Sequence, residues 1–116
     1  MRIAIASDHA ALALNSALVE YLCAAGHDVA DLGPYDETSV DYPDYGYKLA
    51  NAIADGSAER GVALCGSGIG ISMAVNRNSA ARAALVASIS TATAATTSRR
   101  TTPSLRARSI AWSLSI

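Results

Sequence analysis

Apolar residues recur in two alternating patterns along the first 86 residues. Short apolar runs at 2–6, 27–32, 61–64 and 82–86 have the length of buried strands. Between them, the stretches 11–25, 45–54 and 69–76 place apolar residues three and four positions apart, which predicts helices. Gly26 and Gly56 follow two of these stretches, as is typical of residues that end a helix.

Strands that alternate with helices favour a parallel sheet covered by helices on both faces. Right-handed crossovers favour a doubly wound order, so we predict an α/β protein, a three-layer αβα sandwich with a flavodoxin-like parallel sheet. In that order the first and third strands are neighbours, and ligands bind beyond their carboxyl ends. Asp8 and His9 follow the first strand and Cys65 ends the third. The topology therefore predicts one crevice for all three residues.

The segment 62–70, Val-Ala-Leu-Cys-Gly-Ser-Gly-Ile-Gly, carries the strongest candidate chemistry. A glycine loop that opens a helix presents unpaired backbone N–H groups, which bind anions. The same groups stabilise a thiolate, so Cys65 is a candidate base or nucleophile. An inert core cysteine is the simpler interpretation, but core packing does not require alternate glycines at 66, 68 and 70. The loop matches neither the dinucleotide fingerprint nor the Gly-Lys-[Ser/Thr] nucleotide loop, and we interpret it as a cradle for a small anion.

Other polar residues near the expected crevice have two interpretations each. Asp8 can simply cap a helix with His9 in its first turn, or His9 can bind phosphate and carry a proton. Tyr42 lies before Pro43, which suits the start of a helix, or it leans over the crevice. We interpret Cys23 as a packing residue. The two histidines and two cysteines lack zinc-site spacing, so we expect no metal site.

Composition narrows the class of protein. A chain of 116 residues with 51% hydrophobic content fits one domain with one core. Its apolar runs are too short for a signal peptide or a membrane span. Two cysteines do not make a disulfide framework, so we expect a reduced, cytoplasmic setting without membrane contact.

Charge is divided unevenly along the chain. Residues 1–87 carry ten acidic and five basic side chains, whereas residues 88–116 carry four arginines and no acid. We interpret 1–87 as the core and 88–116 as an aberrant C-terminal segment of the same domain, with a reading-frame shift near residue 88 as the hypothesis. A basic segment can bind nucleic acid, but the chain shows no aromatic platform or known module, so we expect no nucleic-acid partner.

Three motifs together resemble a known family. They are Ala-Ser-Asp-His-Ala-Ala at 6–11, Val-Asp-Tyr-Pro-Asp-Tyr at 40–45, and Cys-Gly-Ser-Gly-Ile-Gly-Ile-Ser at 65–72, which Ala-Val-Asn-Arg follows at 74–77. This pattern resembles B-type ribose-5-phosphate isomerases, and galactose-6-phosphate isomerase subunits share much of it. The resemblance implies cofactor-free interconversion of D-ribose 5-phosphate and D-ribulose 5-phosphate in the pentose phosphate pathway. It also implies a homodimer, in some members a tetramer.

The resemblance also implies site residues. Cys65 matches the base that moves a proton between C1 and C2, and Ser67 matches a residue that assists near the sugar oxygens. Residues that match substrate-binding positions are Asp8, His9, Tyr42, Gly66, Gly68, Ile69, Gly70 and Asn76. The backbone N–H groups of 66–70 would hold the enediolate oxygen. A positioned base contributes about 10²–10⁴-fold to such a proton transfer, and each oxyanion donor contributes roughly 3 kcal/mol.

The resemblance covers about residues 1–87. The family continues with a His-Asn-Asp-Ala-Asn segment that opens the sugar ring and with arginines that bind phosphate, whereas Arg99-Arg100-Thr101-Thr102-Pro103 stands there in this chain. The alternatives are therefore an inactive or partner-dependent subunit that binds a sugar phosphate, or a subunit like those of galactose-6-phosphate isomerase. A hydrolase with Cys65 as nucleophile would need His9 as its base.

Overall fold

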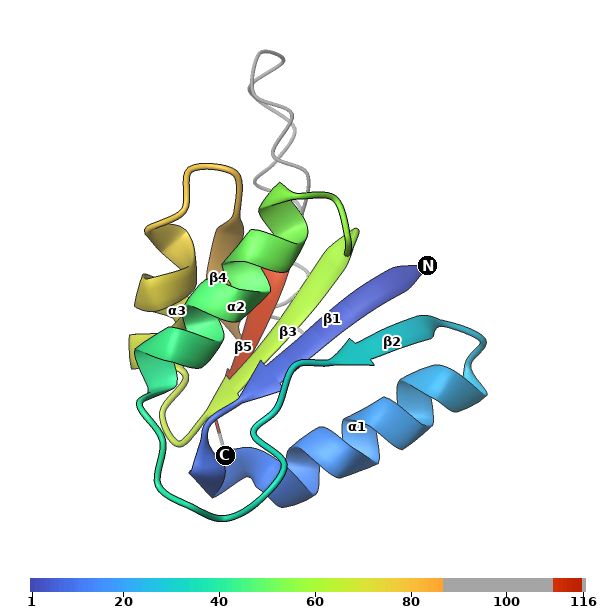
Figure 1. Ribbon diagram of the computed structural model, residues 1–116, viewed down its shortest axis with the longest axis horizontal. Helices are drawn as coiled ribbons and strands as arrows, with labels where there is room; N and C mark the ends of the chain where they lie inside the picture. The colour runs from blue at the N-terminus through green and yellow to red at the C-terminus, as the bar shows by residue number, and fades with distance from the viewer. Residues whose placement is uncertain (87–109, 116) are drawn as a thin grey trace.

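A computed structural model describes residues 1–86 in full and the backbone of residues 110–115. The strands are β1 (Arg2–Ser7), β2 (Asp28–Asp31), β3 (Arg60–Cys65), β4 (Arg82–Val86) and β5 (Ile110–Ser115). The helices are a short 3₁₀ helix η1 (His9–Ala11), α1 (Leu12–Ala24), α2 (Tyr42–Ala54) and α3 (Ile69–Asn76). The predicted alternation of strand and helix is confirmed over residues 1–86 (Figure 1).

The strands form one parallel sheet in the order β2-β1-β3-β5-β4. The predicted parallel sheet is confirmed, and β1 and β3 are neighbours as expected. β5 lies between β3 and β4, so the last two strands are exchanged relative to the flavodoxin order. β5 was not predicted from the sequence. The alternation of Ile110, Trp112 and Leu114 with small residues is the signal that could have found it.

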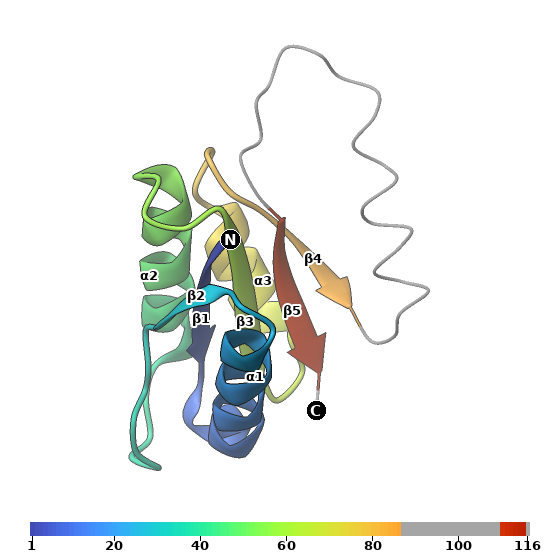
Figure 2. The same cartoon turned by 90° about the vertical axis from the view of Figure 1, so that its right-hand side faces the viewer.

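The helices lie on both faces of the sheet, which confirms the three layers. Figure 2 shows α2 and α3 together on one side of the sheet. Their core is built on alanines of the strands and on larger helix residues, namely Ala4, Ala6, Ala63, Leu49, Ile53, Ile71 and Val75. The opposite face buries Ile5 and Leu64 against Leu14 and Leu18 of α1. Because side chains alternate along a strand, Cys65 belongs to the α2/α3 side.

Two expectations about the helices are wrong. α2 begins at Tyr42, with a proline in its first turn, rather than at Tyr45. Proline suits a first turn because its missing N–H has no helical acceptor there. Cys23 is exposed and does not pack. In the described part of the chain, no helix has the length and apolar character needed to cross a membrane.

Candidate active site

The ends of β1 and β3 meet at the carboxyl edge of the sheet. Ser7 is opposite Leu64 in the register, and the N–H of Asp8 donates to the carbonyl of Leu64 at 3.0 Å. The Asp8 carboxylate then has two acceptor roles. Oδ1 accepts the N–H of Ala10 at 3.0 Å and so caps η1, and Oδ2 accepts the N–H of Gly66 at 3.4 Å. Asp8 is therefore both a cap and a contact of the glycine loop.

Cys65 is held at the start of α3. Its side chain is 4% exposed, and its Sγ accepts the N–H of Gly68 at 2.9 Å. Gly68 precedes α3 with φ +76°, a left-handed conformation that glycine adopts without a side-chain clash. The sulfur thus lies beside a backbone donor, next to the N-terminus of a helix. Burial matches the core interpretation of Cys65, and the hydrogen bond matches the functional one.

The glycine loop has open space over its first half. Gly66 and Ser67 are exposed, and a Cβ added at Gly66 would meet no atom within 4 Å. Ser67 Oγ accepts the N–H of Ile69 at 3.3 Å. The backbone donors of Gly66, Gly68 and Ile69 therefore each have a side-chain acceptor within the protein. Their role in holding an enediolate oxygen stays a prediction.

Tyr42 lies against the second half of the loop. A Cβ added at Gly70 would come within 2.6 Å of Cε2 and Cζ of the Tyr42 ring and within 2.9 Å of its hydroxyl oxygen. Glycine at position 70 is what allows this approach, because any larger residue would displace the ring. Tyr42 as a whole is 43% exposed. The structure therefore brings Tyr42 together with the Cys65 loop.

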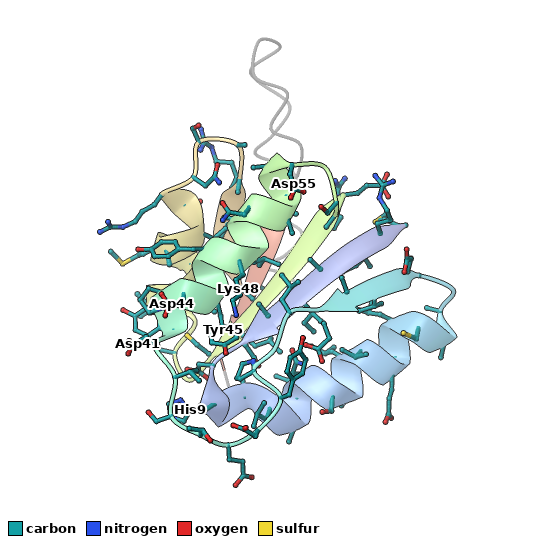
Figure 3. All side chains as sticks on the ribbon, viewed as in Figure 1. His9, Asp41, Asp44, Tyr45, Lys48 and Asp55 are labelled. Atoms are coloured by element: carbon teal, nitrogen blue, oxygen red, sulfur yellow. The ribbon has the colours of Figure 1, made fainter. Side chains whose placement is uncertain are left out.

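His9 lies on η1, at the edge of the sheet from which α2 also begins (Figure 3). Its Nδ1 accepts the N–H of Val40 at 3.3 Å. A neutral histidine that accepts at Nδ1 carries its proton on Nε2. The exposed ring therefore offers Nε2–H as a donor, as a phosphate ligand would.

Asn76 is the one predicted site residue that the structure does not bring to this edge. It ends α3, about 10 Å along the helix from Ile69. Its amide forms a pair with the backbone of β4: Nδ2 donates to the carbonyl of Ala83 at 2.9 Å, and Oδ1 accepts the N–H of Ala83 at 2.7 Å. Both polar atoms are used by the fold, at the amino end of the sheet.

A hollow lies beside α2, and Cys65 is not among the residues that line it. It encloses about 520 Å³ beside Asp41, Asp44, Tyr45 and Lys48. The ammonium of Lys48 lies 4.4 Å from the centre of the Tyr45 ring. Two carboxylates disfavour a phosphate ligand there. Among the residues that the structure describes, no three His, Cys, Asp or Glu side chains converge as metal ligands would.

Known proteins resemble this chain over most of its length. The family model for ribose/galactose isomerase matches residues 3–102. Galactose-6-phosphate isomerase subunit LacB of Clostridium acetobutylicum is 42% identical over 92 residues, which are 79% of this chain and 53% of that protein. A relative in Rickettsia bellii is 45% identical over 93 residues, which are 80% of this chain and 65% of that protein. The chain thus spans less than two thirds of the length of these relatives.

Solved structures give the same answer. The ribose 5-phosphate isomerase of Thermotoga maritima has a TM-score of 0.84 and 40% identity, over 96% of this chain and 72% of that one. Ribose-5-phosphate isomerase B of Mycoplasma genitalium, solved with bound ribulose-5-phosphate, has a TM-score of 0.80 and 34% identity, over 97% of this chain and 71% of that one. Sequence motifs, fold and family model agree, and the chain belongs to the ribose/galactose isomerase family.

Proposed function

We propose that this protein is an aldose–ketose isomerase that interconverts D-ribose 5-phosphate and D-ribulose 5-phosphate. The observation that carries the proposal is the Cys65 sulfur at the start of α3, 2.9 Å from the Gly68 nitrogen and next to a loop with open space above it. Membership of a sugar-phosphate isomerase family supports the reaction class. The Mycoplasma genitalium relative with bound ribulose-5-phosphate supports the pentose.

The residues at this edge supply the parts that such a reaction needs. The thiolate of Cys65 removes the proton from C2 of the open-chain aldose, and the electron pair left behind forms the C1–C2 double bond of an enediolate. The proton of the C2 hydroxyl then moves to the oxygen on C1. The Cys65 thiol returns its proton to carbon C1, and the oxygen on C2 becomes the carbonyl of the ketose. Backbone donors of the loop stabilise the oxyanion in between.

The remaining contacts bind the substrate rather than react with it. The carboxylate of Asp8, already at the loop, accepts hydrogen bonds from sugar hydroxyls. His9 donates Nε2–H to the phosphate, and the exposed face of Tyr42 closes one side of the pocket. Neither a metal nor a nucleotide has a step in this scheme.

The two cysteines allow a matched test of the base. Cys65→Ala removes the thiolate, and we expect kcat for ribose 5-phosphate to fall by about 10²-fold or more. Cys23→Ala is the control, because Cys23 is exposed on α1 and belongs to no part of the site. Conversion is followed by the appearance of ribulose 5-phosphate. Equal kcat in the Cys65→Ala variant and the wild type would show that the sulfur is not the base.

A partner-dependent subunit is the second candidate function. It is favoured by the 42% identity to a galactose-6-phosphate isomerase subunit. In that case the chain alone would bind a sugar phosphate without converting it. Gel filtration reports whether the chain alone forms a homodimer. A shift in melting temperature on addition of ribose 5-phosphate or galactose 6-phosphate, without conversion of either sugar, would identify a binding subunit, whereas conversion by the chain alone would exclude it.

A further inference from the structure

A chain of hydrogen bonds runs from the buried side of α1 to the end of β1. Asn15 is 2% exposed, and its Nδ2 donates to Oδ2 of Asp31 at 3.1 Å. The other carboxylate oxygen of Asp31 accepts the N–H of Gly33 at 3.0 Å. The carbonyl of Gly33 accepts the N–H of Ser7 at 3.0 Å. The turn after β2 therefore holds the last residue of β1 in place.

The next residue along the chain is Asp8, and β3 holds it from the other side. Its N–H donates to Leu64, and its carboxylate accepts from Gly66. The position of this carboxylate thus depends on the turn at 31–33 on one side and on β3 on the other. A shift in either support moves Asp8 relative to the Cys65 loop.

Asn15 is an unusual choice for its position. The apolar residues Leu14 and Leu18 of the same helix pack against the sheet, and a buried amide costs free energy unless it is hydrogen-bonded. Only the donor of Asn15 is used, because its Oδ1 has no partner among the described residues. The one hydrogen bond that this buried side chain makes within the part of the chain that the structure describes is to Asp31. We therefore infer that the role of Asn15 is to hold the Asp31 carboxylate.

We propose that Asn15 and Asp31 are positioning residues that fix the Asp8 carboxylate against the Cys65 loop. Neither residue contacts the substrate, and both act through Gly33 and Ser7. The proposal rests on the proposed function, in which Asp8 binds the sugar.

The first test removes the buried donor. Asn15→Leu keeps a similar volume but leaves Asp31 without its partner, and a misplacement of about 1 Å at a site can cost about 10²-fold in rate. We expect kcat/KM for ribose 5-phosphate to fall by about tenfold or more, mainly through KM. Leu18→Ala is the control, because it opens a cavity in the same α1 layer without touching the turn. Unchanged kinetics in Asn15→Leu would overturn the proposal.

The second test is a rescue at the other partner. In Asp31→Asn the new amide can keep the Gly33 N–H on its oxygen, and Asn15 can rotate so that its unused Oδ1 accepts the new N–H. We expect activity close to the wild type. Asp31→Ala lacks both acceptors and should lose as much activity as Asn15→Leu. Equal losses in the Asn and Ala variants at 31 would contradict a positioning role through these hydrogen bonds.

A spectroscopic measurement separates this proposal from the proposed function. The amide resonance of Gly66 reports its hydrogen bond to Asp8 whether or not the protein is active. We expect it to move in Asn15→Leu and to stay in Leu18→Ala and Asp31→Asn. An inactive wild type would contradict the proposed function alone, whereas a Gly66 amide that stays in place in Asn15→Leu would overturn the positioning role.

Discussion

The two ends of the parallel sheet differ in how much of the surrounding loop is open to solvent. At the amino end, side chains and backbone pair with each other: Arg2 and Glu59 exchange two hydrogen bonds of 2.9 Å, and Asn76 forms two with Ala83. At the carboxyl end, Gly66 and Ser67 are exposed and the space over Gly66 is open. The amino end therefore joins neighbouring elements by paired groups, whereas the carboxyl end leaves part of the glycine loop open to solvent.

The largest effect in this comparison should come from replacing a left-handed glycine by alanine at each end of the sheet. Gly68 and Gly56 have φ of +76° and +83°, a region that costs an L residue about 1–2 kcal/mol. We expect Gly68→Ala to move the N–H away from Cys65 Sγ and to lower kcat about 10–100-fold. Gly56→Ala, at the amino end, should lower stability by a similar amount and leave kcat unchanged. Equal kinetic losses in the two variants would break the comparison.

A smaller effect is expected for the two hydrogen bonds between Asn76 and Ala83 at the amino end of the sheet. Asn76→Ala removes two hydrogen bonds between α3 and β4, and we expect about 1 kcal/mol less stability, since water can replace part of them. KM for ribose 5-phosphate should not change. Asn51→Ala is the matched control, because its amide makes one long bond of 3.4 Å. A raised KM at full stability would instead support the prediction from the sequence that Asn76 binds substrate.

The smallest effect concerns Glu59, also at the amino end. The N–H of Arg2 donates to this exposed carboxylate and lowers its pKa below the usual 4.5. A carboxylate whose pKa is lower in the folded protein than in the unfolded chain stabilises the fold at pH values above the unfolded pKa. That stability is lost as pH falls through the folded pKa. We expect Glu59→Gln to melt slightly earlier than the wild type at pH 7, and we expect the difference to shrink as pH falls through the folded pKa. A difference that does not vary with pH would exclude this carboxylate as its source.

Local patterns in the sequence were enough for much of the fold. α3 and β4 have the bounds that apolar spacing predicted, and the contact of the Asp8 carboxylate with the Gly66 N–H follows from the adjacency of β1 and β3. α2 begins three residues before its predicted start. The start was missed because the sequence around Pro43 fits either a turn or the beginning of a helix. The place of β5 could not be predicted from local spacing, since strand order is set by long-range pairing.

The site itself was predictable in part for the same reason. Cys65 and the glycines form one local motif, which sequence shows directly. Asn76 belongs to a neighbouring motif, yet the length of α3 carries it to the other end of the sheet. The link from Asn15 to Asp31 joins residues of α1 and β2 and becomes visible only when the helix is packed on the sheet.

The position of β5 also decides when this sheet can be completed. β4 pairs in the sheet with β5, and β5 pairs with β3. During synthesis, residues 82–86 leave the ribosome well before residues 110–115. β4 therefore cannot pair in the sheet until β5 has been made. The half of the sheet that contains the Cys65 loop can assemble early, while the other edge waits with its backbone groups unpaired, a state that is prone to aggregation.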